Sequence, residues 1–164
     1  MPSDRPPLCP PIAVEVSDTQ GHLAVDAGEL AALARRTLAR EGVDHASISI
    51  ALVDDPSIRA INHRHLDHDW PTDVITFPLS DADDGLLVGE LVVSAQMAAE
   101  TARGAGGDPR AELALYVIHG LLHLCGFDDL DPEGAALMRR AEAVHLAAEG
   151  LVGHFATEDA RWAS

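Results

Sequence analysis

The sequence predicts an α+β fold in which one small mixed sheet of about four strands is covered by about five helices. A chain of 164 residues with 47% hydrophobic residues fits one domain and can bury a sizeable core. Short β-branched runs and segments with apolar residues at helical spacing follow one another in mixed order, which favours helices on the faces of a single sheet. We expect one domain over residues 1–164, with a flexible leader over residues 1–11 and a tail over about residues 153–164.

The first half of the chain predicts two strands and two helices. Residues 12–16, IAVEV, alternate apolar and polar side chains and predict the first strand. Asp26 is a typical N-cap for a helix that runs to about Arg40. Residues 47–53, SISIALV, form a β-branched run and predict the second strand. A short helix is expected to begin at residues 55–57, DPS, because proline is favoured in a first turn.

The second half begins with a polar, histidine-rich stretch over residues 63–69. It predicts a loop that contains His63, His65 and His68. Further along, Pro109 begins the most apolar helix of the chain. The other expected elements are strands over residues 72–78 and 86–93, a helix from about Ser94 to the glycine cluster at 104–107, and a last helix that is started by residues 131–133, DPE, and runs from Ala135 to about Glu149.

Composition favours a cytoplasmic protein that does not enter a membrane. No apolar run approaches the roughly 18 residues that a membrane span requires. Residues 1–11 contain repeated prolines but no apolar core, so they do not resemble a secretory signal. The two cysteines, Cys9 and Cys125, are too few for a disulfide framework, which fits a reducing compartment.

The chain is strongly acidic, with 27 Asp and Glu residues against 11 Lys and Arg and a formal net charge of −16. Binding to phosphate backbones normally requires clustered basic side chains. The small groups Arg35, Arg36, Arg40 and Arg139, Arg140 are expected to lie on solvated helix faces. A general nucleic-acid-binding role is therefore disfavoured, although the acidity does not exclude nucleic acid as a substrate.

A candidate metal site lies in the segment ELALYVIHGLLHLCGFDDLD. His119 and His123 are four residues apart, so on a helix both imidazoles emerge on one face, about 5–6 Å apart at Cβ. Gly126 can adopt the left-handed conformation that ends a helix, and Asp128 and Asp129 then return toward the imidazoles. Three protein ligands leave a fourth position open for water, which is typical of catalytic zinc. The pattern predicts one Zn²⁺ ion held by His119, His123 and Asp129.

Residues around this site refine the prediction. Gly120 stands where HExxH metalloproteases carry glutamate, which disfavours a peptidase, and a glycine inside a helix also indicates a close approach by another segment. Cys125 is expected to be a small buried hydrophobe rather than a ligand. Glu112, two turns before His119, is a candidate orienting group or base, with a solvated carboxylate as the alternative. Asp73 is expected to serve a turn or an N-cap.

Two motifs resemble those of a known family. The run HGLLHLCGFDD resembles the signature HGxLHLxGYDH of the YbeY family of endoribonucleases, and INHRHLDHDWPTDVITFP resembles that family's second hallmark, LNxxYRxKDxPTDVLSFP. VGELVVS resembles the strand that follows it, so the resemblance spans roughly Ser47 to Ala143. It implies a single-domain α+β fold with one zinc ion at the end of a central helix, and cleavage of single-stranded RNA.

The sequence departs from the family pattern at two places. Asp129 stands where the family has a histidine as third ligand, and Asp128 or Asp131 could replace it because the turn is short and flexible. A carboxylate ligand roughly halves the net charge of a zinc site, which acidifies bound water less and tolerates harder ions such as manganese better. The arginine of the second hallmark falls on Leu66, which cannot stabilise a phosphate. Arg64 is a candidate substitute.

The resemblance implies a zinc-dependent endoribonuclease that takes part in 16S ribosomal RNA 3′-end maturation and ribosome quality control. Its expected partners are ribosomal RNA and the small ribosomal subunit. Two alternatives stay open. One is a ribosome assembly factor whose zinc is mainly structural, and the other is a metallohydrolase that acts on a small phosphoester, because ligand spacing does not name a substrate.

Overall fold

The computed structural model describes residues 11–66, 72–80 and 85–151, which build one four-stranded sheet with helices around it. The strands lie in the order β1-β2-β4-β3. Strands β1, β2 and β4 are parallel to one another and β3 is antiparallel to β4, so the predicted mixed sheet is confirmed. The strands are β1 (Ile12–Asp18), β2 (Ala46–Val53), β3 (Val74–Pro78) and β4 (Leu87–Ser94).

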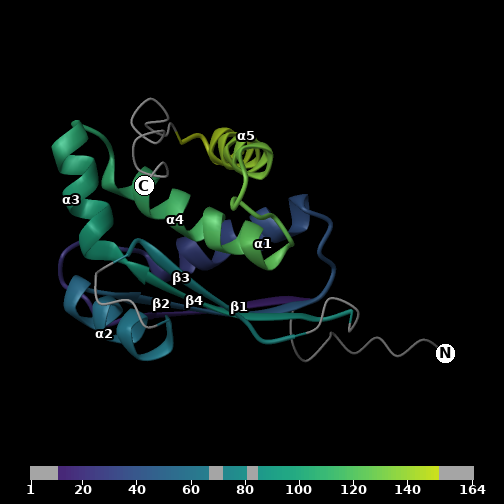
Figure 1. Ribbon diagram of the computed structural model, residues 1–164, viewed down its shortest axis with the longest axis horizontal. Coiled ribbons are helices and arrows are strands. Elements are labelled where there is room, and N and C mark those ends of the chain that lie inside the picture. Colours follow the sequence, from purple (N-terminus) through teal and green to yellow (C-terminus); the bar gives the residue numbers. More distant parts are fainter. Residues whose placement is uncertain (1–10, 67–71, 81–84, 152–164) are drawn as a thin grey trace.

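The helices cover the two faces of the sheet unequally (Figure 1). Helices α1 and α4 lie on one face, α5 packs on the outer side of α4, and α2 lies on the opposite face. Helix α3 packs against α4 at one end of the layer. The helices of the described ranges are α1 (Ala27–Arg40), α2 (Asp55–Leu66), α3 (Ala95–Ala105), α4 (Pro109–Leu124) and α5 (Pro132–Ala148). The α+β class is therefore confirmed.

The alternation of side chains in β2 explains why these layers form. Ile48, Ile50 and Leu52 are at most 2% exposed and join the core cluster with side chains of α1 and α4. Ser47 and Ser49 alternate with the first two of them and are exposed on the other face. Burying each large aliphatic side chain contributes about 1.5–3 kcal/mol. The main core therefore lies between the sheet and the α1–α4 layer.

Helix α4 is the central helix of the protein. The carboxylate of Asp108 caps its start by accepting a hydrogen bond from the N–H of Arg110, and every residue from Ala111 to Leu122 is buried. A helix that is apolar on all sides must lie inside the molecule, here between the sheet and α5. Even so, no helix within the described ranges is long and apolar enough to cross a lipid bilayer.

Gly120 lets α4 approach the sheet closely, as the sequence predicts. A Cβ atom at Gly120 would lie 2.8 Å from Cδ2 of Leu91 and 3.3 Å from Oγ1 of Thr76. These side chains come from β4 and β3. Contact of the helix backbone with both strands fixes the depth of α4 and, with it, the position of the two histidines that flank Gly120.

Most predicted boundaries are confirmed within one or two residues, including the N-cap at Asp26 and the helix start at about Ser94. The predicted loop over residues 63–69 is wrong at its start, because α2 continues to Leu66 and places His63 and His65 in its last turn. No glycine or proline occurs between Pro56 and this turn, and basic side chains suit the C-terminal end of a helix. The leader up to residue 10, His68 and the tail over residues 153–164 lie outside the described residues.

The close contact at Gly120 predicts opposite effects for one substitution at two helical glycines. Gly120→Ala should destabilise the fold by about 1–3 kcal/mol, because the buried Leu91 must shift. Gly104→Ala should be neutral or stabilise by up to about 1 kcal/mol, because nothing lies within 4 Å of its Cβ position. Urea unfolding monitored by circular dichroism measures both, and equal changes in the two variants would contradict the close approach.

Candidate metal centre

The structure brings the three predicted side chains together at the end of α4. The Nε2 atoms of His119 and His123 lie 3.1 Å apart. Asp129, in the loop between α4 and α5, places Oδ2 3.6 Å from Nε2 of His119 and Oδ1 3.6 Å from Nε2 of His123. One atom from each residue can therefore face a common point, and the three form a group that could hold a metal ion.

The spacing of these atoms suits one small cation. In a tetrahedral site with ligand bonds of about 2.0–2.1 Å, two ligand atoms lie about 3.3–3.4 Å apart, close to the values seen here. Unshared electron pairs on two imidazole nitrogens and a carboxylate repel one another unless a positive charge lies between them. The cluster also lies at the C-terminal end of α4, where the helix dipole favours a cation.

The turn after α4 explains how Asp129 reaches the imidazoles. Gly126 adopts a left-handed conformation with φ of 104°, and the N–H of Phe127 donates to the carbonyl oxygen of Leu122. A Cβ atom at Gly134, in the first turn of α5, would collide with the carbonyl oxygen of Asp128. The loop that carries Asp129 is therefore held between the end of α4 and the start of α5.

The two alternative third ligands have other roles. Asp128 Oδ1 accepts a hydrogen bond from the N–H of Leu130 at 3.0 Å. Asp131 is the N-cap of α5, and its Oδ1 accepts from the N–H of Gly134 at 2.6 Å. Both side chains stabilise the loop and the following helix start, whereas Asp129 faces the imidazoles.

Glu142 is a site residue that the sequence analysis missed. It lies on α5, is 1% exposed, and its Oε1 lies 2.6 Å from Nδ1 of His119. A carboxylate at this nitrogen accepts a hydrogen bond from Nδ1–H. This favours the tautomer in which Nε2 of His119 carries the free electron pair. The available signal was its position between Met138 and Leu146, both buried, because an acid at helical spacing within an apolar stripe must have a partner.

The surroundings shift the two imidazoles in opposite directions. For His119, burial is the largest influence and lowers the pKa, but the hydrogen bond and charge of Glu142, with the charges of Asp73 and Asp129, raise the pKa above its ordinary value. For His123, burial and then the neighbouring His119 lower the pKa below its ordinary value. The pair therefore differs in basicity although both rings belong to one helix.

Other predicted residues lie as follows. Glu112 is 5% exposed, so the alternative of a solvated carboxylate is wrong. Cys125 is half-buried, and burial raises the pKa of its thiol to about 11, as fits a packing role. Arg64 is exposed in the last turn of α2, a helix that lies on the sheet face opposite α4. Leu66 ends α2.

A hollow of about 440 Å³ opens beside the cluster. His119 and His123 line one side of it, and residues of β3 with the segment just before that strand, Asp73 included, line the other. Its wall also includes Thr72 and Thr76. The cluster therefore borders space in which a substrate could lie next to a bound ion.

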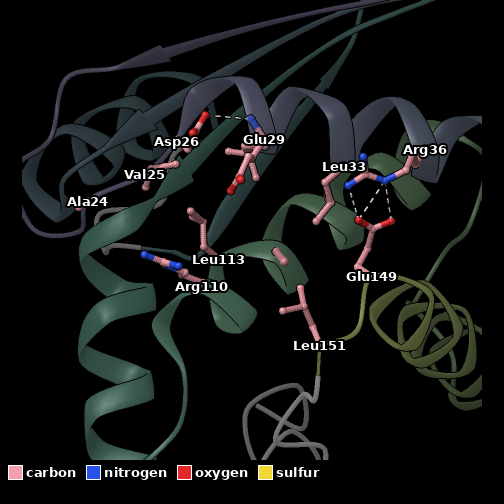
Figure 2. Close-up of a pocket in the computed structure, with 12 residues that line it drawn as sticks. Ala24, Val25, Asp26, Glu29, Leu33, Arg36, Arg110, Leu113, Glu149 and Leu151 are labelled. Carbon is pink, nitrogen blue, oxygen red and sulfur yellow. Dashed lines mark hydrogen bonds and ion pairs between the residues drawn. The ribbon is translucent and has the colours of Figure 1, made fainter.

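A second hollow, of about 500 Å³, lies between α1, α4 and the end of α5 and is a weaker candidate site (Figure 2). Its floor is apolar, with Leu33, Leu113 and Leu151 among its residues. At one end Arg36 forms an ion pair with Glu149. The described lining contains no histidine or cysteine, so this hollow lacks the donor set found at the end of α4.

Fold and site together define a class of α+β proteins in which a buried helix presents two imidazoles and a returning carboxylate beside a mixed sheet. A family model described as Endoribonuclease YbeY matches residues 15–150. The chain belongs to the YbeY family, as its two motifs predict.

Individual relatives agree with this assignment. An endoribonuclease YbeY from Rhodopirellula baltica is 46% identical over 127 residues, which cover 76% of this chain and 63% of that protein. One from Pelotomaculum thermopropionicum is 37% identical over 139 residues, covering 79% and 91%. A solution structure of a Thermotoga maritima protein has a TM-score of 0.56 at 24% identity, covering 82% of this chain and 90% of that one, which supports the fold.

The chain spans less than two thirds of some of these relatives. The matched segment covers 63% of the Rhodopirellula protein and 66% of an endoribonuclease YbeY from Anaeromyxobacter dehalogenans. Because those proteins are longer, the activity that their names state is a proposal for this chain.

The contact between Glu142 and His119 predicts that Glu142→Gln weakens metal binding. The amide is uncharged and can present its N–H₂ to Nδ1, so His119 loses the partner that fixes its donor atom. We expect the affinity for Zn²⁺ to fall about 10- to 100-fold, measured by competition with a chromogenic chelator. Glu133→Gln, at an exposed position of the same helix, should leave the affinity unchanged. Equal affinities in both variants and the parent protein would show that Glu142 does not orient His119.

Proposed function

We propose that this chain is a zinc-dependent endoribonuclease that hydrolyses single-stranded RNA. The observation that carries the proposal is the placement of one donor atom from each of His119, His123 and Asp129 within 4.8 Å of one another beside an open hollow. Membership of the YbeY family, whose relatives are named endoribonucleases, supports RNA as the substrate.

The residues present fit a metal ion, and each has a derivable task. His119, His123 and Asp129 would hold the ion, and Glu142 fixes which nitrogen of His119 faces it. When bound, such an ion supplies Lewis-acid stabilisation of a phosphoryl oxygen and lowers the pKa of water. The scissile phosphodiester would lie in the hollow beside β3. The imidazoles border this hollow, so the phosphodiester would be positioned by the metal site and not by a basic surface.

The acidity of the chain is consistent with a site in which the bound ion, and not a basic protein surface, attracts the RNA. With a formal net charge of −16, the surface as a whole repels a polyanion, so RNA must be attracted locally by the bound cation. The carboxylate of Asp129 reduces the positive charge that three neutral imidazoles would leave on the ion. We therefore propose zinc as the ion, with manganese better tolerated than at an all-histidine site.

Cleavage assays test the nuclease proposal directly. His123→Ala should remove one of three ligands and lower cleavage of a labelled single-stranded RNA at least about 100-fold, and a chelator should do the same to the parent protein. His22→Ala changes an exposed histidine that belongs neither to the cluster nor to the lining of its hollow, and this variant should cleave normally. Equal cleavage by the two variants would end the nuclease proposal, whereas hydrolysis of small phosphodiesters without RNA cleavage would favour a small-substrate metallohydrolase.

We further propose that the RNA is the 3′ end of 16S ribosomal RNA, within a small ribosomal subunit, in the cytoplasm. The family resemblance supports this partner, and the alternative of an assembly factor is favoured by Leu66 in place of the family's arginine. Co-sedimentation with small subunits, combined with an assay of 3′-end trimming, separates the enzyme from the assembly factor. If the protein is an enzyme of ribosome maturation, both the parent protein and the His123→Ala variant should bind small subunits, while only the parent trims the RNA. Absence of the parent protein from the small-subunit fraction would contradict the proposed partner.

A further inference from the structure

The cluster has donors for an ion, but hydrolysis also needs an acceptor for the proton of the attacking water. Helix α4 carries no proton acceptor directly after His119, where HExxH metalloproteases have their glutamate. Position 120 is glycine, and Leu91 and Thr76 fill the space beside it. Asp129 faces the two imidazoles, and Glu142 lies behind His119 at Nδ1. An acceptor that touches substrate must therefore come from another element that borders the hollow.

Asp73 is the acidic residue within the described lining of that hollow. It precedes β3 and is 8% exposed. Its Oδ1 accepts hydrogen bonds from the N–H of Val74 at 2.8 Å and from Oγ1 of Thr72 at 3.3 Å, and its backbone carbonyl accepts from the N–H of Ser94. These contacts fix the side chain at the start of the strand, so its position does not depend on substrate.

The charge of Asp73 acts on one imidazole of the cluster. It is one of the charges that raise the pKa of His119, although β3 and α4 are distant in the sequence. Asp73, His119 and His123 border the same hollow of about 440 Å³. A water molecule in that hollow would therefore have both imidazoles and Asp73 among the residues around it.

We propose that Asp73 is a catalytic residue that accepts the proton of the attacking water, which deepens the proposed function and rests on it. The water oxygen forms a bond to phosphorus while its proton passes to the Asp73 carboxylate. The bond from phosphorus to the leaving ribose oxygen breaks with its electron pair, and that oxygen takes a proton from solvent. Asp73 then returns its proton to solvent. The sequence predicts only a turn or N-cap role for Asp73.

The test compares Asp73→Asn with Asp44→Asn, which makes the same change at an exposed position far from the hollow. Asparagine keeps an oxygen for the N–H of Val74, so the local structure should persist, and thermal unfolding checks this. We expect kcat to fall about 100-fold or more with KM within a few-fold of the parent value, while Asp44→Asn behaves as the parent. A loss of kcat explained by loss of folded protein would overturn the proposal.

Two readouts separate catalysis from structure and from metal binding. Removal of a negative charge beside the phosphate should tighten binding of an uncleavable phosphorothioate RNA in Asp73→Asn, and its Zn²⁺ affinity should stay within a few-fold of the parent. Added formate should restore part of the activity of Asp73→Ala and none in Asp73→Asn, because only alanine leaves room for a small carboxylate. Weaker RNA binding, a large loss of Zn²⁺ affinity, or absence of rescue would overturn the assignment.

The same variants assayed on bis(p-nitrophenyl) phosphate distinguish failure of this inference from failure of the proposed function. If the parent hydrolyses this diester but not RNA, the RNA substrate is wrong and Asp73→Asn still tests the proton acceptor. If Asp73→Asn hydrolyses it as fast as the parent, Asp73 is not the acceptor even where RNA is the substrate. A parent protein inactive on both would overturn both proposals.

Discussion

The hydrogen bond between Nδ1 of His119 and Glu142 is the interaction on which the rest of the site depends. It joins the central helix α4 to the outer helix α5 and chooses the nitrogen that faces His123 and Asp129. Oε2 of Glu142 is buried and makes no hydrogen bond with the described residues, so this carboxylate is stabilised mainly through His119. Helix α5 is held in turn by ion pairs of Glu149 with Arg36 and Arg40 of α1. The position of the His119 ring therefore depends on contacts among α1, α4 and α5.

Much of the fold was predictable because local signals and tertiary packing agree in this chain. The N-cap residue Asp26 and the β-branched run of β2 predicted element ends within one or two residues. His119 and His123 were predictable because four residues make one turn of a helix. Glu142 and Asp73 were not assigned to the site, because they approach the cluster only through packing of α5 and β3 against α4, and spacing along the chain carries no trace of that contact.

The described surroundings of the cluster are unusually rich in carboxylates for a proposed RNA enzyme. Asp129 and Glu142 contact the imidazoles directly, and Asp73 borders the same hollow. Each of these carboxylates attracts a cation and repels a phosphate. A change in their charge should therefore alter the affinity of the site for metal and its affinity for RNA in opposite directions. Family membership and site geometry both favour the ion-binding side of this balance.

All three donor atoms of the cluster come from one continuous stretch, His119 to Asp129, of which only the last part leaves the buried helix. The imidazoles are fixed by α4, whereas Asp129 depends on a short loop whose side chains are partly exposed. Such loops open locally at a much lower free energy than the whole fold. Local opening of this loop would separate Asp129 from the imidazoles, and an ion that contacts all three side chains opposes that opening, so ion binding should stabilise the loop.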